Sequence, residues 1–237
     1  MGCPMPSALL VKFFHDLPTP RQGEDFEIWR TRHFRATQRF KKRLLAKYNE
    51  GTLLRLLQSD CEETRKGALF ALGLTASMDA NLAMSRLLHD DDGEVVDMAT
   101  AGMWNLWFRA SIETNNKELQ RLLRLRDREK ALAGLMKLAE LAPDFAEVYN
   151  QRAIVYFRLK QYEDSITDCQ KALEINPWHF GAQVGMAQCF MKLRKHRSAL
   201  KAFRATLKIH PRMEGVRDAI RTLERVLGEE GRRDDKK

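Results

Sequence analysis

The sequence predicts an all-α protein, a right-handed α-solenoid built from helix-turn-helix repeats. Proline and glycine are scarce, with 7 and 13 copies among 237 residues, which leaves little turn material for a sandwich or barrel. Pro143, Pro177 and Pro211 are spaced by 34 residues, and each follows an apolar, helix-like run. Upstream, the chain matches itself after a shift of 31 residues. Two periods therefore predict two kinds of helical repeat.

The composition favours a soluble, folded chain with acidic partners. Hydrophobic residues make up 44% and charged residues 31%, which argues against overall disorder. The formal net charge of +9 produces a field that attracts acidic surfaces and weakens with salt. No run approaches the roughly 18 apolar residues of a membrane span. We therefore expect a cytoplasmic protein without a membrane segment.

Residues 1–50 form a basic N-terminal extension that we expect to be partly helical. Residues 30–47 contain no acidic residue. Their candidate phosphate-binding cations are Arg30, Arg35, Arg39, Lys41, Lys42 and Arg43. Such a segment suits non-specific binding of nucleic acid. It also suits an amphipathic helix that covers the first end of a solenoid.

Residues 51–111 carry the shorter period. A shift of 31 residues aligns Arg55 with Arg86, Asp60 with Asp91, and each following apolar run with its copy. This pattern resembles HEAT repeats, so we expect two helix pairs here. Two repeats are few for a solenoid, and we expect the pair to pack on the next array. The expected joint is an aromatic group, Trp104, Trp107 and Phe108.

Residues 112–228 carry the longer period and end in a capping helix. Residues 146–179 place aromatic and small residues at regular intervals before a proline: Tyr149, Ala153, Tyr156, Ser165, Ala172 and Pro177. Residues 180–213 repeat the pattern with Gln183, Ala187, Phe190, Ala199, Thr206 and Pro211. This pattern resembles the tetratricopeptide repeat family. Departures from it are Arg152, Cys169, Gln183 and Thr206.

The remaining boundaries follow from the same register. Residues 112–145 are a degenerate copy, residues 214–228 form the capping helix, and residues 229–237 are expected to be a disordered tail. A HEAT-like pair followed by tetratricopeptide repeats resembles a group of bacterial repeat proteins that mostly lack an assigned activity.

Catalytic and metal-binding signatures are missing from the sequence. The histidines show no HExxH spacing and suit surface or turn positions, and no glycine-rich phosphate loop occurs. The four cysteines have no metal-ligand spacing. We therefore expect a protein that is not an enzyme and needs neither cofactor nor metal.

The resemblance implies a concave groove lined by the first helix of each repeat. The positions that would face a bound peptide are Asn150, Gln151, Ile154, Arg158, Val184, Gln188 and Lys192. The family's carboxylate clamp, which captures a C-terminal acid, is not reproduced. Asn116, Gly181 and Gly185 stand where its basic residues would be. A groove of amides, apolar side chains and two cations favours a peptide of acidic character.

The leading interpretation is a non-catalytic scaffold or adaptor that binds a peptide or helix of a partner protein in this groove. The alternative is an RNA-associated or ribosome-associated accessory protein that binds through residues 30–47. The sequence leaves the oligomeric state open.

Overall fold

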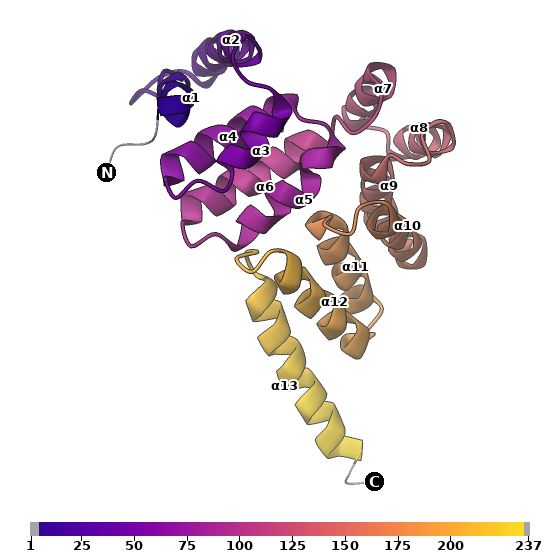
Figure 1. Ribbon diagram of the computed structural model, residues 1–237. Coiled ribbons are helices and arrows are strands. Elements are labelled where there is room, and N and C mark those ends of the chain that lie inside the picture. The colour runs from indigo at the N-terminus through magenta and orange to yellow at the C-terminus, as the bar shows by residue number, and fades with distance from the viewer. Residues whose placement is uncertain (1–4, 235–237) are drawn as a thin grey trace. The chain divides into compact units, whose positions relative to one another are not determined.

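The computed structural model describes residues 5–234, and the surroundings of side chains from 8 to 228. Within this range every regular element is helical, and no strand occurs (Figure 1). The chain divides between Leu106 and Trp107 into two compact units. The all-α prediction is therefore confirmed. None of the described helices is long and apolar enough to cross a membrane.

The first unit consists mainly of six α-helices. These are α1 (Met5–His15), α2 (Phe26–Leu45), α3 (Glu50–Leu56), α4 (Glu62–Thr75), α5 (Asn81–Arg86) and α6 (Gly93–Trp107), with short 3₁₀ turns at Met78–Ala80 and Leu87–His89. Side-chain caps begin two of the helices: Asp25 accepts from the first turn of α2, and Asn49 from that of α3.

The core of the first unit depends on a close approach of α4 and α6. A Cβ added at Gly73 would lie 2.9 Å from the Cα of Gly102, so α4 cannot carry a side chain at this crossing unless the helices shift. Helix α1 covers the other side of α4, where Leu10 is fully buried beside Gly67. Phe40 of α2 packs edge-on against Phe70, with ring centroids 5.1 Å apart. Both α1 and α2 therefore pack on α4.

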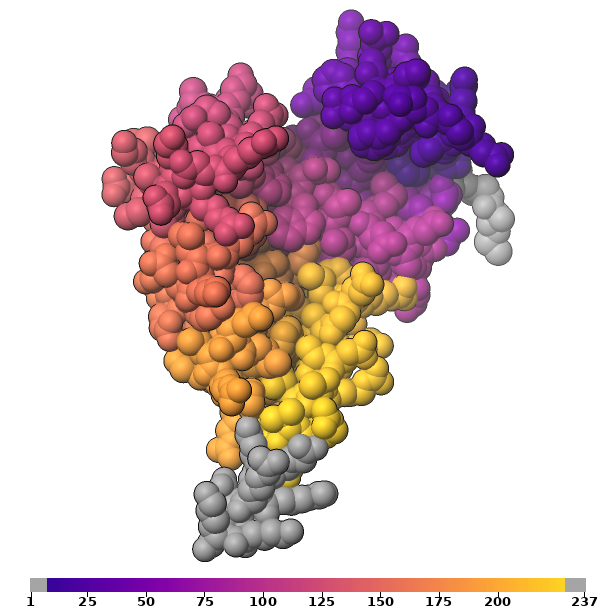
Figure 2. Space-filling view, turned by 180° about the vertical axis from the view of Figure 1, so that it is seen from behind, coloured from indigo at the N-terminus to yellow at the C-terminus, as the bar shows by residue number. Residues whose placement is uncertain are grey.

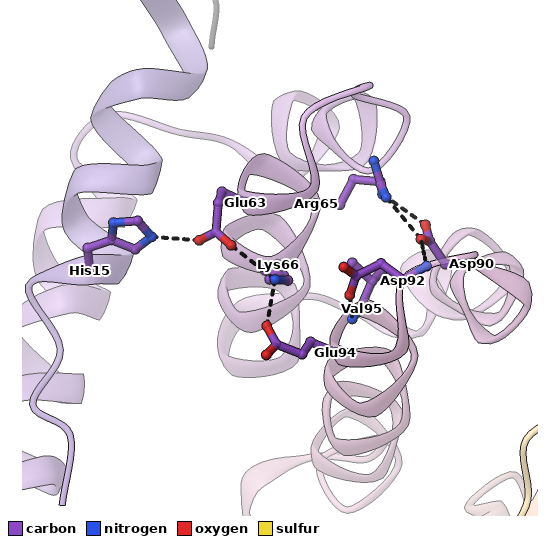
Figure 3. A network of polar contacts seen from close by, with 8 residues as sticks. All are labelled: His15, Glu63, Arg65, Lys66, Asp90, Asp92, Glu94 and Val95. Carbon is purple, nitrogen blue, oxygen red and sulfur yellow. Dashed lines mark hydrogen bonds and ion pairs between the residues drawn. The ribbon is translucent and has the colours of Figure 1, made fainter. Parts of the chain in front are cut away.

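A polar network ties the ends of α1, α4 and α6 together (Figure 3). Lys66 donates to Glu63 at 3.0 Å and to Glu94 at 2.6 Å, and His15 lies 2.6 Å from the other oxygen of Glu63. Hydrogen bonding to Glu94 is the main reason that the pKa of Lys66 is raised. Asp92 caps α6 by accepting from the backbone N–H of Val95 at 2.9 Å. Charged residues near the starts of α4 and α6 thus serve as caps and helix-to-helix links.

The second unit contains three helix pairs and a final helix. The elements are α7 (Glu113–Leu123), α8 (Arg128–Leu141), α9 (Ala146–Arg158), α10 (Tyr162–Ile175), α11 (Phe180–Lys192), α12 (His196–Ile209) and α13 (Val216–Asp234). The three pairs lie within residues 112–145, 146–179 and 180–213. Lys160 and Arg194, 34 residues apart, both have positive φ, 63° and 54°, at the turn inside a pair. The repeat period therefore extends to the backbone conformation of the turns.

Small residues allow the helices within a pair to approach. Ser165 of α10 is buried and donates its hydroxyl to the carbonyl oxygen of Ala153 in α9 at 2.8 Å. Ala172 and Ala187 are fully buried in the two hydrophobic clusters of this unit. Small side chains at the expected repeat positions therefore bring the helices close together.

Helix α13 covers the last repeat, beside the orange residues of α12 in the rear view (Figure 2). Val216 and Leu223 are buried against this repeat, as a capping helix requires. The helix begins at Val216 and continues to Asp234, further than the 214–228 expected. The expected tail is thus helical in its first part, and residues 235–237 lie outside the described residues.

Candidate peptide-binding groove

A pocket lies between α9 and α11, the first helices of neighbouring repeats. Residues spaced by three or four positions share one face of a helix, so each helix presents a row of side chains toward the other. The pocket has a volume of about 110 Å³ and is lined by Asn150, Ala153, Ile154, Phe157, Arg158, Ser165, Cys169, Gly181, Gly185 and Gln188.

Four of the seven predicted peptide contacts line this pocket: Asn150, Ile154, Arg158 and Gln188. Val184 instead packs on the cluster formed with α12 and α13. Gln151 donates its amide to the carboxylate of Glu147 at 2.6 Å. Lys192 is exposed near the end of α11, outside the pocket lining. The structure therefore brings the predicted residues of α9 together more completely than those of α11.

The two glycines of α11, which stand where basic residues of the family's carboxylate clamp would be, are part of the pocket. Gly181 and Gly185 both line it. A Cβ built at Gly185 would meet a single neighbour within 4 Å, the Sγ of Cys169 at 3.4 Å. The missing side chain thus lets Ser165 and Cys169 of α10, both buried, form the bottom of the pocket.

The floor of the pocket is uncharged. Cys169 and Cys189 are free and buried, and burial raises the pKa of both thiols. Cys189 donates its thiol to the hydroxyl of Ser165 at 3.1 Å. A buried neutral thiol is a poor nucleophile, so these cysteines act as packing groups.

A buried acid lies directly beside the pocket. Glu147 of α9 is fully buried and accepts from Asn150 at 3.0 Å and from Gln151, while its other oxygen lies 2.9 Å from Nε2 of His179. Asn150 is only 3% exposed, so its main contact is with Glu147. The sequence had suggested a surface or turn position for His179. It lies at a turn, as the N-cap of α11, but is completely buried.

Two cations, Arg158 and Lys192, lie in the last turns of α9 and α11. Arg158 lines the pocket and is exposed, and Lys192 is exposed one helix away. In the part of the chain that the structure describes, neither forms an ion pair. An exposed cation without an internal partner is available to an acidic ligand.

The predicted basic segment forms most of α2 and lies in the first unit. Arg35, Arg39 and Lys42 are exposed, and among the described residues they form no ion pair. Arg30 pairs with Glu27 at 2.8 Å, Arg43 pairs with Asp16 at 2.8 Å, and Lys41 is half-buried. Three of the six candidate cations therefore remain available on one face of α2.

Across the described residues, no group of three or more His, Cys, Asp and Glu side chains is arranged to hold a metal ion. The site therefore consists of a pocket with an uncharged floor and a cationic rim.

Comparison with known proteins identifies part of the second unit. Models of the family described as tetratricopeptide repeat match residues 146–179 and 182–212. A TPR repeat-containing protein of Rhizobium etli is 34% identical over 97 residues, which is 41% of this chain and 48% of that protein. The Protein SGT1 homolog of Bos taurus is 33% identical over 84 residues, or 35% of this chain and 25% of that protein. The chain thus spans less than half the length of these relatives.

Two solved structures are similar over about half of the chain. The Arabidopsis OM64 TPR domain has a TM-score of 0.44 and 20% identity, covering 48% of this chain and 93% of that one. The first TPR of Spaghetti, bound to the HSP90 peptide SRMEEVD, has a TM-score of 0.43 and 22% identity, covering 49% and 89%. The predicted repeats at 146–179 and 180–213 are confirmed by the family models, whereas the HEAT-like pair and the copy at 112–145 stay predictions.

Proposed function

We propose that this chain, which carries two tetratricopeptide repeats, is a non-catalytic adaptor that holds a peptide or helix of a partner protein between α9 and α11. The observation that carries the proposal is the pocket to which both repeats contribute. Packed helices form it before any ligand arrives, so binding needs little reorganisation of the repeats. Concave, mostly apolar sites with a few polar groups are typical of binding sites.

The charges at the rim support a partner of acidic character. Arg158 and Lys192 point to a ligand that supplies carboxylates, because long-range attraction speeds association and selects the orientation of binding. Gly181 and Gly185 occupy the positions of the clamp's cations, so the groove is not built to capture a C-terminal carboxylate in the family's usual way.

The test is the double substitution Arg158→Glu with Lys192→Glu, compared with Lys201→Glu and Lys208→Glu. The second pair changes the net charge equally on exposed residues of α12, which does not line the pocket. Partners captured by the full chain from lysate are identified by mass spectrometry, and helicity is followed by circular dichroism. The first pair is expected to lose the partners and the second to retain them. Equal retention by both variants rules out the groove.

A second candidate function is RNA binding through α2, supported by the exposed face of Arg35, Arg39 and Lys42. It predicts an affinity for a structureless RNA that falls steeply with salt, with a slope reduced by about 0.7 for each phosphate contact removed. The variant with all three residues changed to alanine is compared with Arg30→Ala and Arg43→Ala, whose cations are already paired. An unchanged salt slope in the triple variant excludes this candidate.

A further inference from the structure

Gly185 is a helical glycine that the packing of the protein does not require. Glycine inside a helix is less favourable than alanine. Gly73 has a packing reason, since its Cβ would collide with the backbone of Gly102, and Gly134 lies against Leu122. At Gly185 a Cβ would make only an ordinary contact, 3.4 Å from the Sγ of Cys169. The side chain that is missing here adds space to the pocket and nothing else.

We propose that Gly185, together with Gly181, keeps open a specificity pocket for one aliphatic side chain of the partner peptide. Arg158 at the rim pairs with an acidic residue next to that side chain. The inference rests on the proposed function and deepens it, because it names the chemistry of the peptide that the groove selects.

The size of the pocket favours an aliphatic side chain over an aromatic one. A protein cavity of about 150 Å³ lined by apolar side chains accommodates benzene. The volume here is smaller, about 110 Å³. Valine, leucine, isoleucine or methionine therefore suits the pocket, and the bicyclic indole ring is too large.

The lining favours an uncharged side chain. Ala153, Ile154 and Phe157 provide apolar walls. At the floor, the hydroxyl of Ser165 already donates to Ala153, and burial keeps the Cys169 thiol neutral by raising its pKa. A charged group inserted here would lose its hydration without gaining a partner. Charge recognition is thus left to Arg158 at the rim.

The experiment begins with selection of twelve-residue peptides from a random display library on the full-length chain. Selected sequences are expected to share an aliphatic residue beside Asp or Glu. Synthetic versions of one peptide, with leucine, alanine, valine or tryptophan at that position, are then titrated by fluorescence anisotropy. Replacing leucine with alanine or tryptophan is expected to weaken binding about tenfold or more, since burial of a leucine side chain is lost.

Two variants test the pocket itself. Gly185→Met is expected to weaken binding of the leucine peptide by about tenfold or more, because the methionine side chain fills the pocket. Gly185→Ala is expected to shift preference from leucine toward the smaller valine or alanine peptide. Its thermal midpoint should stay the same or rise by about 2–4 °C through helix propensity. Gly228→Ala, in α13 with no atom within 4 Å of its Cβ, is the control and leaves the peptide preference unchanged.

The outcomes separate the two proposals. Failure to select any peptide, or selected peptides that bind equally well to the Arg158→Glu, Lys192→Glu variant, contradicts the proposed function. Peptides that depend on Arg158 but carry no aliphatic residue, or that tolerate both Gly185 variants, leave the proposed function standing and overturn the specificity pocket. Because Gly185→Ala makes only an ordinary contact, it decides the question even if Gly185→Met fails to fold.

Discussion

The carboxylate of Glu147 lies 2.9 Å from Nε2 of His179, with both side chains fully buried. Nδ1 of His179 accepts the backbone N–H of Ala182 at 3.1 Å, so Nε2 is the nitrogen that donates to Glu147. The indole of Trp107 stacks on the imidazole with centroids 4.3 Å apart. One buried acid thereby joins α9 to the N-cap of α11, next to the proposed binding pocket.

Removal of this acid is expected to destabilise the protein strongly. Glu147→Ala leaves the buried donors of His179 and Asn150, and the half-buried amide of Gln151, without their acceptor, at a cost of about 2–3 kcal/mol. Glu147→Gln is also expected to lose stability. In one orientation its amide N–H groups face the donor of His179, and in the other they face the donors of Asn150 and Gln151. Urea unfolding followed by circular dichroism measures both. The exposed Glu140→Ala should change stability by less than about 0.5 kcal/mol, and an equal loss in this control would contradict the argument.

Arg152 and Asp168 form a second link, in which a departure from the repeat pattern has a structural explanation. The guanidinium of Arg152 donates to both carboxylate oxygens of Asp168, at 2.7 and 2.6 Å. Arg152→Leu alone is expected to cost about 3 kcal/mol, because it leaves a buried carboxylate without its partner. Arg152→Leu combined with Asp168→Leu should recover most of that loss. Additive losses in the double-mutant cycle would show that the pair is not coupled.

The same pair gives a pH dependence with a defined sign. Burial raises the pKa of Asp168, and the hydrogen bond from Arg152 opposes this effect. Without Arg152 the folded-state pKa rises further above its unfolded value, so the folded state holds a proton more tightly. The Arg152→Leu variant is therefore expected to recover stability as the pH falls toward the carboxyl range. Urea midpoints at neutral and acidic pH measure this recovery of stability. If the variant instead loses more stability than the parent chain on acidification, the prediction is wrong.

In the first unit, the pKa shift of Glu63 implies the opposite dependence of folding stability on pH. Hydrogen bonds from His15 and Lys66 lower the pKa of Glu63. A depressed folded-state pKa stabilises the protein above the ordinary carboxyl pKa, and this stabilisation disappears as the pH falls through the folded value. Glu63→Gln should lose less stability on acidification than the parent chain. Asp97→Asn, an exposed residue of α6, serves as the control and should follow the parent.

Replacing Gly73 with alanine is expected to change the stability in the direction opposite to that given by helix propensity. Alanine in a helix is ordinarily favoured over glycine by about 1 kcal/mol. A methyl group at Gly73 meets the Cα of Gly102 at 2.9 Å, so α4 and α6 must separate, and we expect a net loss of about 1–3 kcal/mol. In the same unit, Gly51→Ala contacts only the side chain of Asn49, at 3.7 Å. Thermal unfolding of the two variants distinguishes them: a stabilised Gly73→Ala would mean that the helices do not cross so closely.

Much of the fold was predictable because its signals are local. Helix ends follow from proline and from caps such as Asn49, and the 34-residue period follows from small residues such as Ala153 and Ala187. Four predicted groove residues line the pocket for the same reason, since a repeat position specifies which face of a helix a residue occupies. Gly185 was visible in the sequence, but only its surroundings in the structure, with a single atom within 4 Å of an added Cβ, distinguish a pocket from a helix contact.

By itself, the sequence determined the all-α class, the 34-residue period and the face of α9 that lines the pocket, all of which depend on spacing along one chain segment. The tertiary structure alone decided that Glu147 meets His179 and that Arg152 meets Asp168. These partners are 32 and 16 residues apart. Their pairing depends on the angle and separation of packed helices, and many side chains set that geometry together.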